Sequence, residues 1–93
     1  MRLDVFLKLS RLIPRRTLAQ EFCDKGRITV NGASAKSSKE VKAGDRIGIK
    51  RRDTITNVEV LEVPAKKQLS KAEAPEIFKL ISTESSGEPG LLP

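Results

Sequence analysis

Several residue types that carry chemistry are scarce in this sequence. Its 93 residues include no histidine, tryptophan or tyrosine, three phenylalanines and one cysteine, Cys23. Without histidine the chain lacks the commonest general base and zinc ligand, and a single thiol can form neither an internal disulfide nor a structural zinc site. No glycine-rich phosphate loop or nucleophile elbow is present. We therefore expect a chain that is not an enzyme and needs no cofactor or metal, with Cys23 as a small buried apolar residue.

Long apolar runs are also missing. No window approaches the roughly 18 apolar residues of a membrane-spanning helix, and residues 1–8 lack the apolar run of a signal peptide. Hydrophobic residues make up 38% of the chain, which predicts a small core. The length allows one domain, and a lone cysteine is typical of a reducing compartment. We expect a soluble, cytoplasmic, monomeric protein.

The sequence does contain an excess of positive charge, concentrated in one half. The formal net charge is +6 and the pI is about 9.8. Residues 1–52 hold 14 Lys and Arg against 5 Asp and Glu, whereas residues 53–93 hold 4 against 7. This distribution favours one charged face over evenly spread solubilising charge. It predicts a polyanionic partner such as nucleic acid.

The first 26 residues have the pattern of two short helices. Apolar residues recur at intervals of three and four over residues 3–13, and Pro14 interrupts them, because proline fits only the first turn of a helix. We predict a first helix that ends near Leu12 and a second that begins at about Pro14 and stops at Gly26. The residues predicted to face inward from the second helix are Leu18, Ala19, Phe22 and Cys23.

Alternating residues and turn signals predict a small, mostly antiparallel sheet after the helices. Residues 27–30 alternate with period two and lead into Asn31-Gly32, the strongest short hairpin signal. A weak strand follows at 33–36, and residues 46–50 form a further strand. Over 55–63 the alternation slips, which predicts either a bulge or a strand covered on both faces.

The C-terminal third gives weaker signals. Pro64 closes the sheet, and residues 70–73 match a capping box at which a third helix would start. The other start is Pro75, which would bury Ile77, Phe78 and Ile81. The Ser, Gly, Glu and Pro content of residues 82–93 predicts a disordered tail.

The predicted fold is therefore α+β, with two N-terminal helices packed on the sheet. Its parts are a domain over 1–63, an extension with a helix over 64–81 and the tail over 82–93.

The candidate binding residues gather in the first sixteen positions. The cations there are Arg2, Lys8, Arg11, Arg15 and Arg16. Arginine forks suit phosphate oxygens, and the start of the second helix offers free backbone N–H groups. Asp4, the one acid among these cations, either caps the first helix, where it also lies four residues before Lys8, or orients a neighbouring arginine.

Other cations are weaker candidates. They are Lys25, Arg27, Lys36 and the run Lys50-Arg51-Arg52. The run is also explained as charge on an edge strand that blocks aggregation. Phe6 and Phe22 lie on apolar stripes, so we expect both in the core rather than stacked on bases.

These residues resemble the S-four RNA-binding domain, a family named for small-subunit ribosomal protein four. The resemblance covers residues 1–50 in order. It rests on Arg2-Leu3-Asp4, Leu7, Arg11-Leu12, Arg16, Ala19, Gly26, Ile28, Val30, Asn31-Gly32, Lys36 and Val41-Lys42-Ala43-Gly44-Asp45. Residues 2–8 and 15–19 are most similar to the ribosome-associated quality-control branch, a relative of the fifteen-kilodalton ribosome-associated heat-shock branch.

The resemblance implies a fold in which two helices pack on a small sheet and grip structured RNA. It implies binding of rRNA and tRNA on large ribosomal subunits that hold a stalled nascent chain, and assistance to the quality-control factor that adds alanine tails. The implied RNA-facing residues are Arg2, Asp4, Lys8, Arg11, Arg15, Arg16 and Lys36. Pro14 departs from the family pattern, because a basic or small polar residue is common there.

Four other functions stay open from the sequence. The protein could recycle large subunits with peptidyl-tRNA, as the heat-shock branch implies, or serve as an accessory domain of an RNA-modifying enzyme such as a pseudouridine synthase. A DNA-binding helix-turn-helix is the third, although the hairpin directly after Gly26 argues against it. A chaperone-like interaction protein is the fourth.

Overall fold

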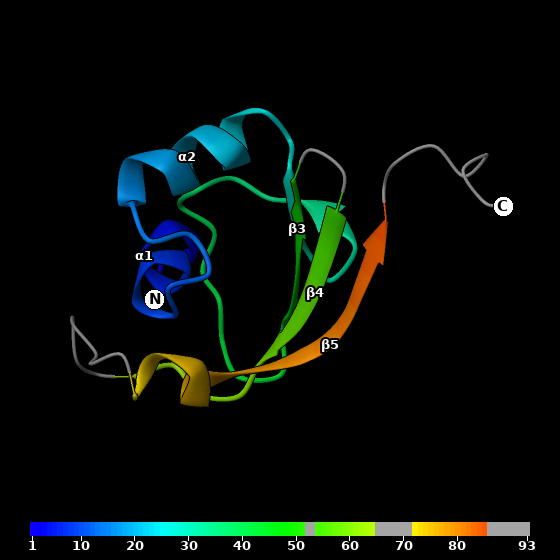
Figure 1. Ribbon diagram of the computed structural model, residues 1–93. Helices are drawn as coiled ribbons and strands as arrows, with labels where there is room; N and C mark the ends of the chain where they lie inside the picture. Colours follow the sequence, from blue (N-terminus) through cyan, green and yellow to red (C-terminus); the bar gives the residue numbers. More distant parts are fainter. Residues whose placement is uncertain (52–53, 65–71, 86–93) are drawn as a thin grey trace, which may run out of the picture.

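Two short helices and a five-stranded sheet form the described part of the protein, residues 1–51, 54–64 and 72–85 of the computed structural model (Figure 1). The helices are α1, Leu3–Leu9, and α2, Arg16–Asp24. The strands are β1, Ile28–Val30, β2, Ala33–Ser34, β3, Arg46–Lys50, β4, Thr54–Val60, and β5, Phe78–Ser85. Their order is β2-β1-β3-β4-β5, with every neighbouring pair antiparallel. The predicted α+β fold is confirmed.

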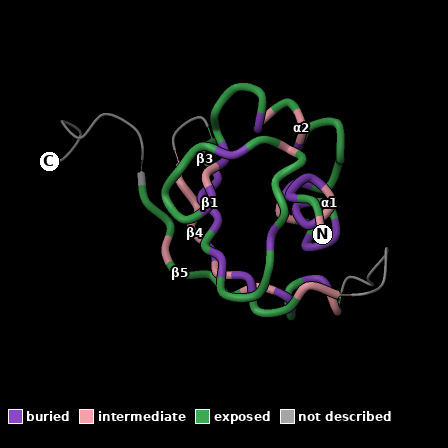
Figure 2. Tube along the Cα trace, turned by 180° about the vertical axis from the view of Figure 1, so that it is seen from behind, coloured by how far each residue is buried: buried purple, intermediate pink, exposed green. Residues whose placement is uncertain are grey.

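The core lies between the helical layer and one face of the sheet, where the tube in Figure 2 is coloured as buried. Period-two alternation turns one set of strand residues toward the helices. The largest fully buried side chains are Phe6, Leu3, Leu7, Ile13, Ile28, Ile47, Ile49, Val41, Val58 and Val60. Cys23 is buried in the same cluster, as the sequence predicts. Among the described residues, none of the helices is long and apolar enough to cross a membrane.

Helix α1 ends at Leu9, earlier than the predicted end near Leu12. Arg11 has a φ of 62°, in the left-handed region, and a right-handed helix cannot continue through that conformation. The Ser10 hydroxyl supports the turn: it donates to the Leu7 carbonyl oxygen at 3.1 Å and accepts the Leu12 N–H at 3.4 Å. The chain therefore changes direction at Arg11, before the proline that the sequence marks as the break.

Helix α2 begins at Arg16, two residues after the predicted start at Pro14. Ala19 and Cys23 face the core, as predicted, because they lie four residues apart on one side of the helix. The inward placement of Leu18 is wrong, since its side chain is 39% exposed. Leu18 precedes Ala19 by one residue and so lies about 100° around the helix from it.

The predicted hairpin at Asn31-Gly32 is confirmed between β1 and β2. Asn31 has a φ of 53° and Gly32 a φ of 89°, the positive values that a tight two-residue hairpin turn requires. The Asn31 amide also donates to Asp45 Oδ1 at 3.2 Å, and Asn31 Oδ1 accepts the Arg46 N–H at 3.0 Å. The turn is thereby joined to the start of β3.

The predicted C-terminal helix is wrong. Residues Ala74–Ile77 form a single 3-10 turn, η1, with Pro75 in its first turn, and the chain then extends into β5. Strand β5 pairs with β4 along its length, so backbone groups that a helix would satisfy internally are satisfied by the neighbouring strand. The predicted disorder is also wrong for residues 82–85, which belong to β5. The remainder of that tail and the capping box at 70–71 lie outside the described residues, and the boundaries of the three parts stay predictions.

The irregularity predicted over residues 55–63 has two causes. Strand β4 ends at Val60, so Leu61 and Val63 do not continue its alternation. The register between β4 and β5 shifts between Asn57 and Val58. Asn57 pairs with Ser82 and Val58 with Leu80, which leaves Ile81 as the extra residue of a bulge in β5 rather than in β4.

Candidate nucleic-acid interface

Asp4 lies at the centre of a polar cluster between the two helices. Its side chain is 0% exposed. Asp4 Oδ1 accepts a hydrogen bond from Arg2 Nε at 3.2 Å, and Asp4 Oδ2 accepts bonds from Arg16 Nε at 3.1 Å and Gln20 Nε2 at 2.9 Å. A carboxylate can be buried here because both of its oxygens have donors. We call these four residues, Arg2, Asp4, Arg16 and Gln20, the Asp4 clamp.

The structure places Asp4 where both of its predicted roles require it: the residue lies in the first turn of α1, and it binds two neighbouring arginines. Within the described residues its ion pairs are with Arg2 and Arg16, not with Lys8, the partner that helical spacing favours. Asp4 therefore orients arginines, which is one of the two predicted roles.

The N-terminus of α1 is held by a loop from the middle of the chain. The backbone N–H groups of Leu3 and Asp4 donate to the carbonyl oxygens of Lys39 and Ser37, at 2.8 and 3.2 Å. Residues in the first turn of a helix have no partner within that helix, so these loop carbonyls satisfy them. The contact fixes the position of Asp4 relative to the sheet.

Burial on its own raises the pKa of the Asp4 carboxyl. The hydrogen bonds from Gln20 and Arg16, together with the positive charges of Arg16 and Arg2, outweigh this effect and hold the pKa below its ordinary value of 3.8. The carboxylate is therefore ionised at neutral pH and keeps both arginines paired.

Within the described residues, the pairing with Asp4 uses only Nε of each guanidinium, and its terminal nitrogens have no hydrogen-bond partner. Arg2 and Arg16 each bind Asp4 through Nε, and their side chains are 46% and 48% exposed. The terminal nitrogens of a guanidinium are the pair that forks around a phosphate or carboxylate. Asp4 thus fixes the orientation of two arginines without consuming the donors that suit a phosphate.

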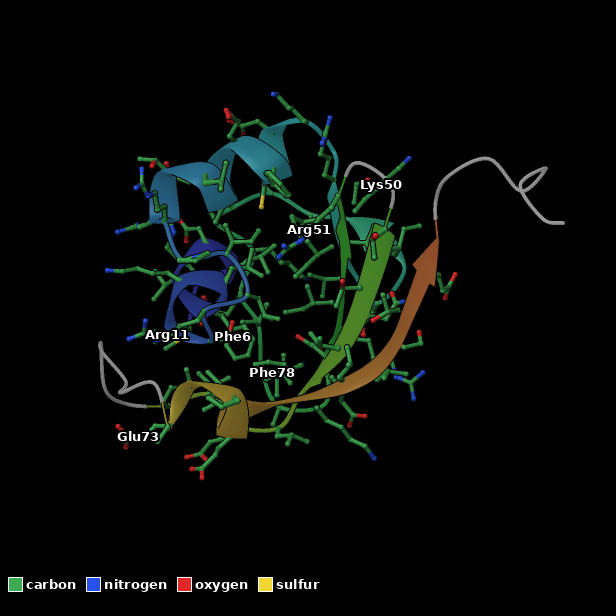
Figure 3. All side chains as sticks on the ribbon, in the orientation of Figure 1. Phe6, Arg11, Lys50, Arg51, Glu73 and Phe78 are labelled. Atoms are coloured by element: carbon green, nitrogen blue, oxygen red, sulfur yellow. The ribbon has the colours of Figure 1, made fainter. Side chains whose placement is uncertain are left out.

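The remaining predicted residues surround the Asp4 clamp without joining it. Lys8 is exposed on the last turn of α1, and Arg11 lies on the side of α1 away from the sheet (Figure 3). Arg15 is the exposed N-cap of α2, which has no side-chain cap. Lys36 is exposed on a loop, next to Ser37, whose carbonyl oxygen accepts the hydrogen bond from the Asp4 N–H. None of these four pairs with a carboxylate among the described residues.

Gln20 is the residue of the Asp4 clamp that the sequence interpretation missed. It lies four residues after Arg16, on the same face of α2, so the helical spacing does place the two side by side. Its side chain is neutral, so the charge pattern of the sequence does not mark it as a site residue. Its bond to Asp4 is nevertheless the shortest in the Asp4 clamp.

The one thiol of the chain has no role in this site. Burial raises the pKa of Cys23 to about 11, and the negative charges of Asp4 and Asp24 add to the effect. Since the thiolate is the nucleophile and the metal ligand, this cysteine is inert at neutral pH. Within the described residues no group of three or more His, Cys, Asp or Glu gathers as metal ligands do.

A small sheet carrying two helices that present paired and unpaired arginines defines a class of nucleic-acid-binding domain. The model of the S4 domain family matches residues 1–47, which include both helices and the whole Asp4 clamp. The chain belongs to the S4 domain family.

The similarity to individual proteins extends beyond the residues that the S4 family model matches. A protein of Bacillus subtilis named RQC P-site tRNA stabilizing factor is 46% identical over 88 residues, covering 95% of this chain and all of the relative. A protein of the same name from Helicobacter pylori is 41% identical over 73 residues, covering 78% of this chain and 87% of the relative.

Two solved structures are also similar. One is the trimeric structure of heat shock protein 15 from Vibrio cholerae, with a TM-score of 0.78 and 25% identity over 88% of this chain and 82% of that one. The other is the solution structure of a hypothetical protein, HP1423, with a TM-score of 0.77 and 37% identity over 90% of this chain and all of that one.

Proposed function

We propose that this protein is a non-catalytic RNA-binding factor that stabilises P-site tRNA on the large ribosomal subunit during ribosome-associated quality control of stalled nascent chains. The observation that carries the proposal is the Asp4 clamp, which fixes two arginines with their terminal nitrogens free. The names of the similar proteins point to the same role, and the similarity spans nearly the full length of both chains.

The mechanism we propose is electrostatic and depends on shape. Arg2 and Arg16 contact phosphates from fixed positions, while Lys8, Arg11 and Arg15 add charge around them. The described aromatic side chains pack on the core rather than standing free to stack on bases, so recognition relies on RNA shape and phosphate positions. If about five phosphates are neutralised, affinity falls with a log–log salt slope of roughly −4.

The finer parts of the proposal concern partners. We propose that the helical face contacts large-subunit rRNA as well as tRNA, that the bound protein assists the alanine-tailing factor, and that it acts in the cytoplasm. We further propose that it acts as a monomer, although one structural neighbour is trimeric.

A second candidate function comes from the same neighbour. The fold is similar to heat shock protein 15, which favours a heat-shock-type factor that recycles large subunits carrying peptidyl-tRNA. The two candidates share the RNA interface and differ in the partner: only the quality-control role requires co-purification with the factor that adds alanine tails.

The test is a pull-down of the tagged protein from cells, followed by analysis of the bound ribosomal particles. We expect large subunits that carry peptidyl-tRNA, together with the alanine-tailing factor. Arg16→Gln should abolish their recovery, whereas Lys79→Gln, which removes one exposed positive charge from β5, should leave it intact. Equal recovery with both variants would contradict the proposed interface, and recovery of subunits without the tailing factor would favour the heat-shock-type role.

A further inference from the structure

A second basic site lies at the other end of α2 from the Asp4 clamp. It is a pocket of about 370 Å³ lined by Lys25, Gly26, Arg27, Lys50 and Arg51. Four of these five residues are cations, and no carboxylate lines the pocket among the described residues. The edge-strand explanation of the Lys50-Arg51-Arg52 run is wrong for Lys50, because this residue ends β3, which lies inside the sheet and pairs with both β1 and β4. Arg52 lies outside the described residues.

Two arginines of this pocket are held by neutral groups. Arg51 Nη2 donates to the Leu12 carbonyl oxygen at 2.6 Å, and in Figure 3 the Arg51 side chain points from the end of β3 toward the helices. The Arg27 guanidinium lies over the Phe22 ring, 5.8 Å from its centroid. Both side chains are thus oriented, and no acid among the described residues forms an ion pair with either of them.

This arrangement contrasts with the Asp4 clamp. There the carboxylate neutralises part of the charge of Arg2 and Arg16, whereas the four cations of the pocket pair with no carboxylate in the part of the chain that the structure describes. The C-terminal end of the α2 dipole is equivalent to about half a negative charge. Lys25 alone is enough to balance this charge, so the other three cations of the pocket are in excess of it. The helix dipole therefore accounts for the presence of Lys25 but not for the presence of the other three cations.

From this geometry we infer that the pocket is a second binding site for the phosphate backbone of RNA. The inference rests on the proposed function and extends the RNA contact from the start of α2 to its end. Nine helical residues span about 13 Å, so the two sites are far enough apart to hold different phosphates of one RNA. The Arg51 bond to Leu12 joins the pocket to the loop that carries Arg11 and Arg15, which places cations along the path between the sites.

The test removes two of the four positive charges that line the pocket with the double variant Arg27→Gln/Lys50→Gln. The matched control is Arg46→Gln/Lys79→Gln, which removes one Arg and one Lys charge from exposed strand positions away from the pocket. Binding to an unmodified tRNA transcript is measured by fluorescence anisotropy across a salt series, and circular dichroism checks that both variants are folded.

We expect the pocket variant to bind about tenfold more weakly near 0.1 M salt and to lose about 1.8 from the magnitude of the salt slope, since two phosphate contacts each contribute about 0.9. The control should keep the wild-type slope. Equal losses of tRNA affinity in the pocket variant and in the control would overturn the inference, because they would show only an effect of net charge. Binding of tRNA by the wild-type protein would in that case still support the proposed function. Absence of tRNA binding by the wild-type chain would overturn both. Unchanged tRNA binding with pocket-dependent binding of a poly-glutamate peptide would reassign the pocket to an acidic protein partner.

Discussion

Arg16 and Asp4 lie twelve residues apart and meet between α1 and α2, with Arg16 Nε 3.1 Å from Asp4 Oδ2. The carboxylate is buried and the arginine is half exposed. The pair therefore stabilises the packing of α1 against α2. It also holds the Arg16 guanidinium in an orientation from which it can bind an external phosphate.

Asp4→Asn should destabilise the protein by about 1–3 kcal/mol, because a buried charge is lost from two ion pairs while the amide keeps one acceptor. The cost stays below that of breaking a fully buried pair, since Arg2 and Arg16 can turn to water. Urea unfolding followed by circular dichroism measures it. Asp24→Asn, an exposed acid at the end of α2, is the control and should change the free energy of unfolding little; equal effects would contradict a special role for Asp4.

The contribution of Asp4 to stability should depend on pH. Its pKa is lowered in the folded protein, so the folded state binds fewer protons than the unfolded state near pH 4. The stabilisation is fully present above the unfolded pKa and is lost as the pH falls through the folded pKa. Unfolding at several pH values between about 2 and 7 should show the difference between the wild type and Asp4→Asn shrinking as the pH falls below the ordinary pKa of 3.8. A constant difference over that range would show that the charge is not the cause.

Gln20→Ala should weaken tRNA binding by about three- to tenfold with an unchanged salt slope. The variant removes a bond that orients Asp4 but no charge, so the number of phosphate contacts stays the same. Arg16→Gln, in contrast, should lower the magnitude of the slope by about 0.9. Anisotropy across a salt series distinguishes the two. A reduced slope in Gln20→Ala would mean that this residue affects how many phosphates are bound.

Gly48→Ala should destabilise the sheet by about 1–2 kcal/mol. A Cβ at this position would lie 2.5 Å from Thr29 Oγ1 and 3.2 Å from Asn57 Oδ1, on the strands paired to either side. In a Thr29→Ala background the first contact is gone, and the same substitution should cost little. A double-mutant cycle of unfolding free energies measures the coupling, and simple additivity would contradict the steric explanation.

The Cys23 thiol should react slowly in the native protein. With a pKa of about 11, only a minute fraction is thiolate at pH 8, and the side chain is buried. Alkylation by iodoacetamide, followed by mass spectrometry, should be at least tenfold faster in denaturant than in buffer. Equal rates would show that the thiol is accessible in the folded state.

Much of the fold could be predicted from local signals. Asn31-Gly32 requires positive φ at both residues, and the structure has that turn. The amphipathic spacing of residues 3–13 located a helix, but its end was misplaced because nothing local marks Arg11 as left-handed. The same spacing arguments failed for residues 77–81. There the chain extends because β4 offers a partner, and a sequence window does not contain that partner.

The sequence by itself determined the two helices, the hairpin, the basic N-terminal half and membership of the S4 domain family, because each depends on residue type and short spacing. Only the tertiary structure decided what those residues contact. Asp4 could have paired with Lys8 within its own helix, and Arg51 could have remained at a sheet edge. Their partners, Arg16 and the Leu12 carbonyl, lie 12 and 39 residues away. Packing of helices on the sheet brings such groups together, and it is this packing that turns scattered cations into oriented ones.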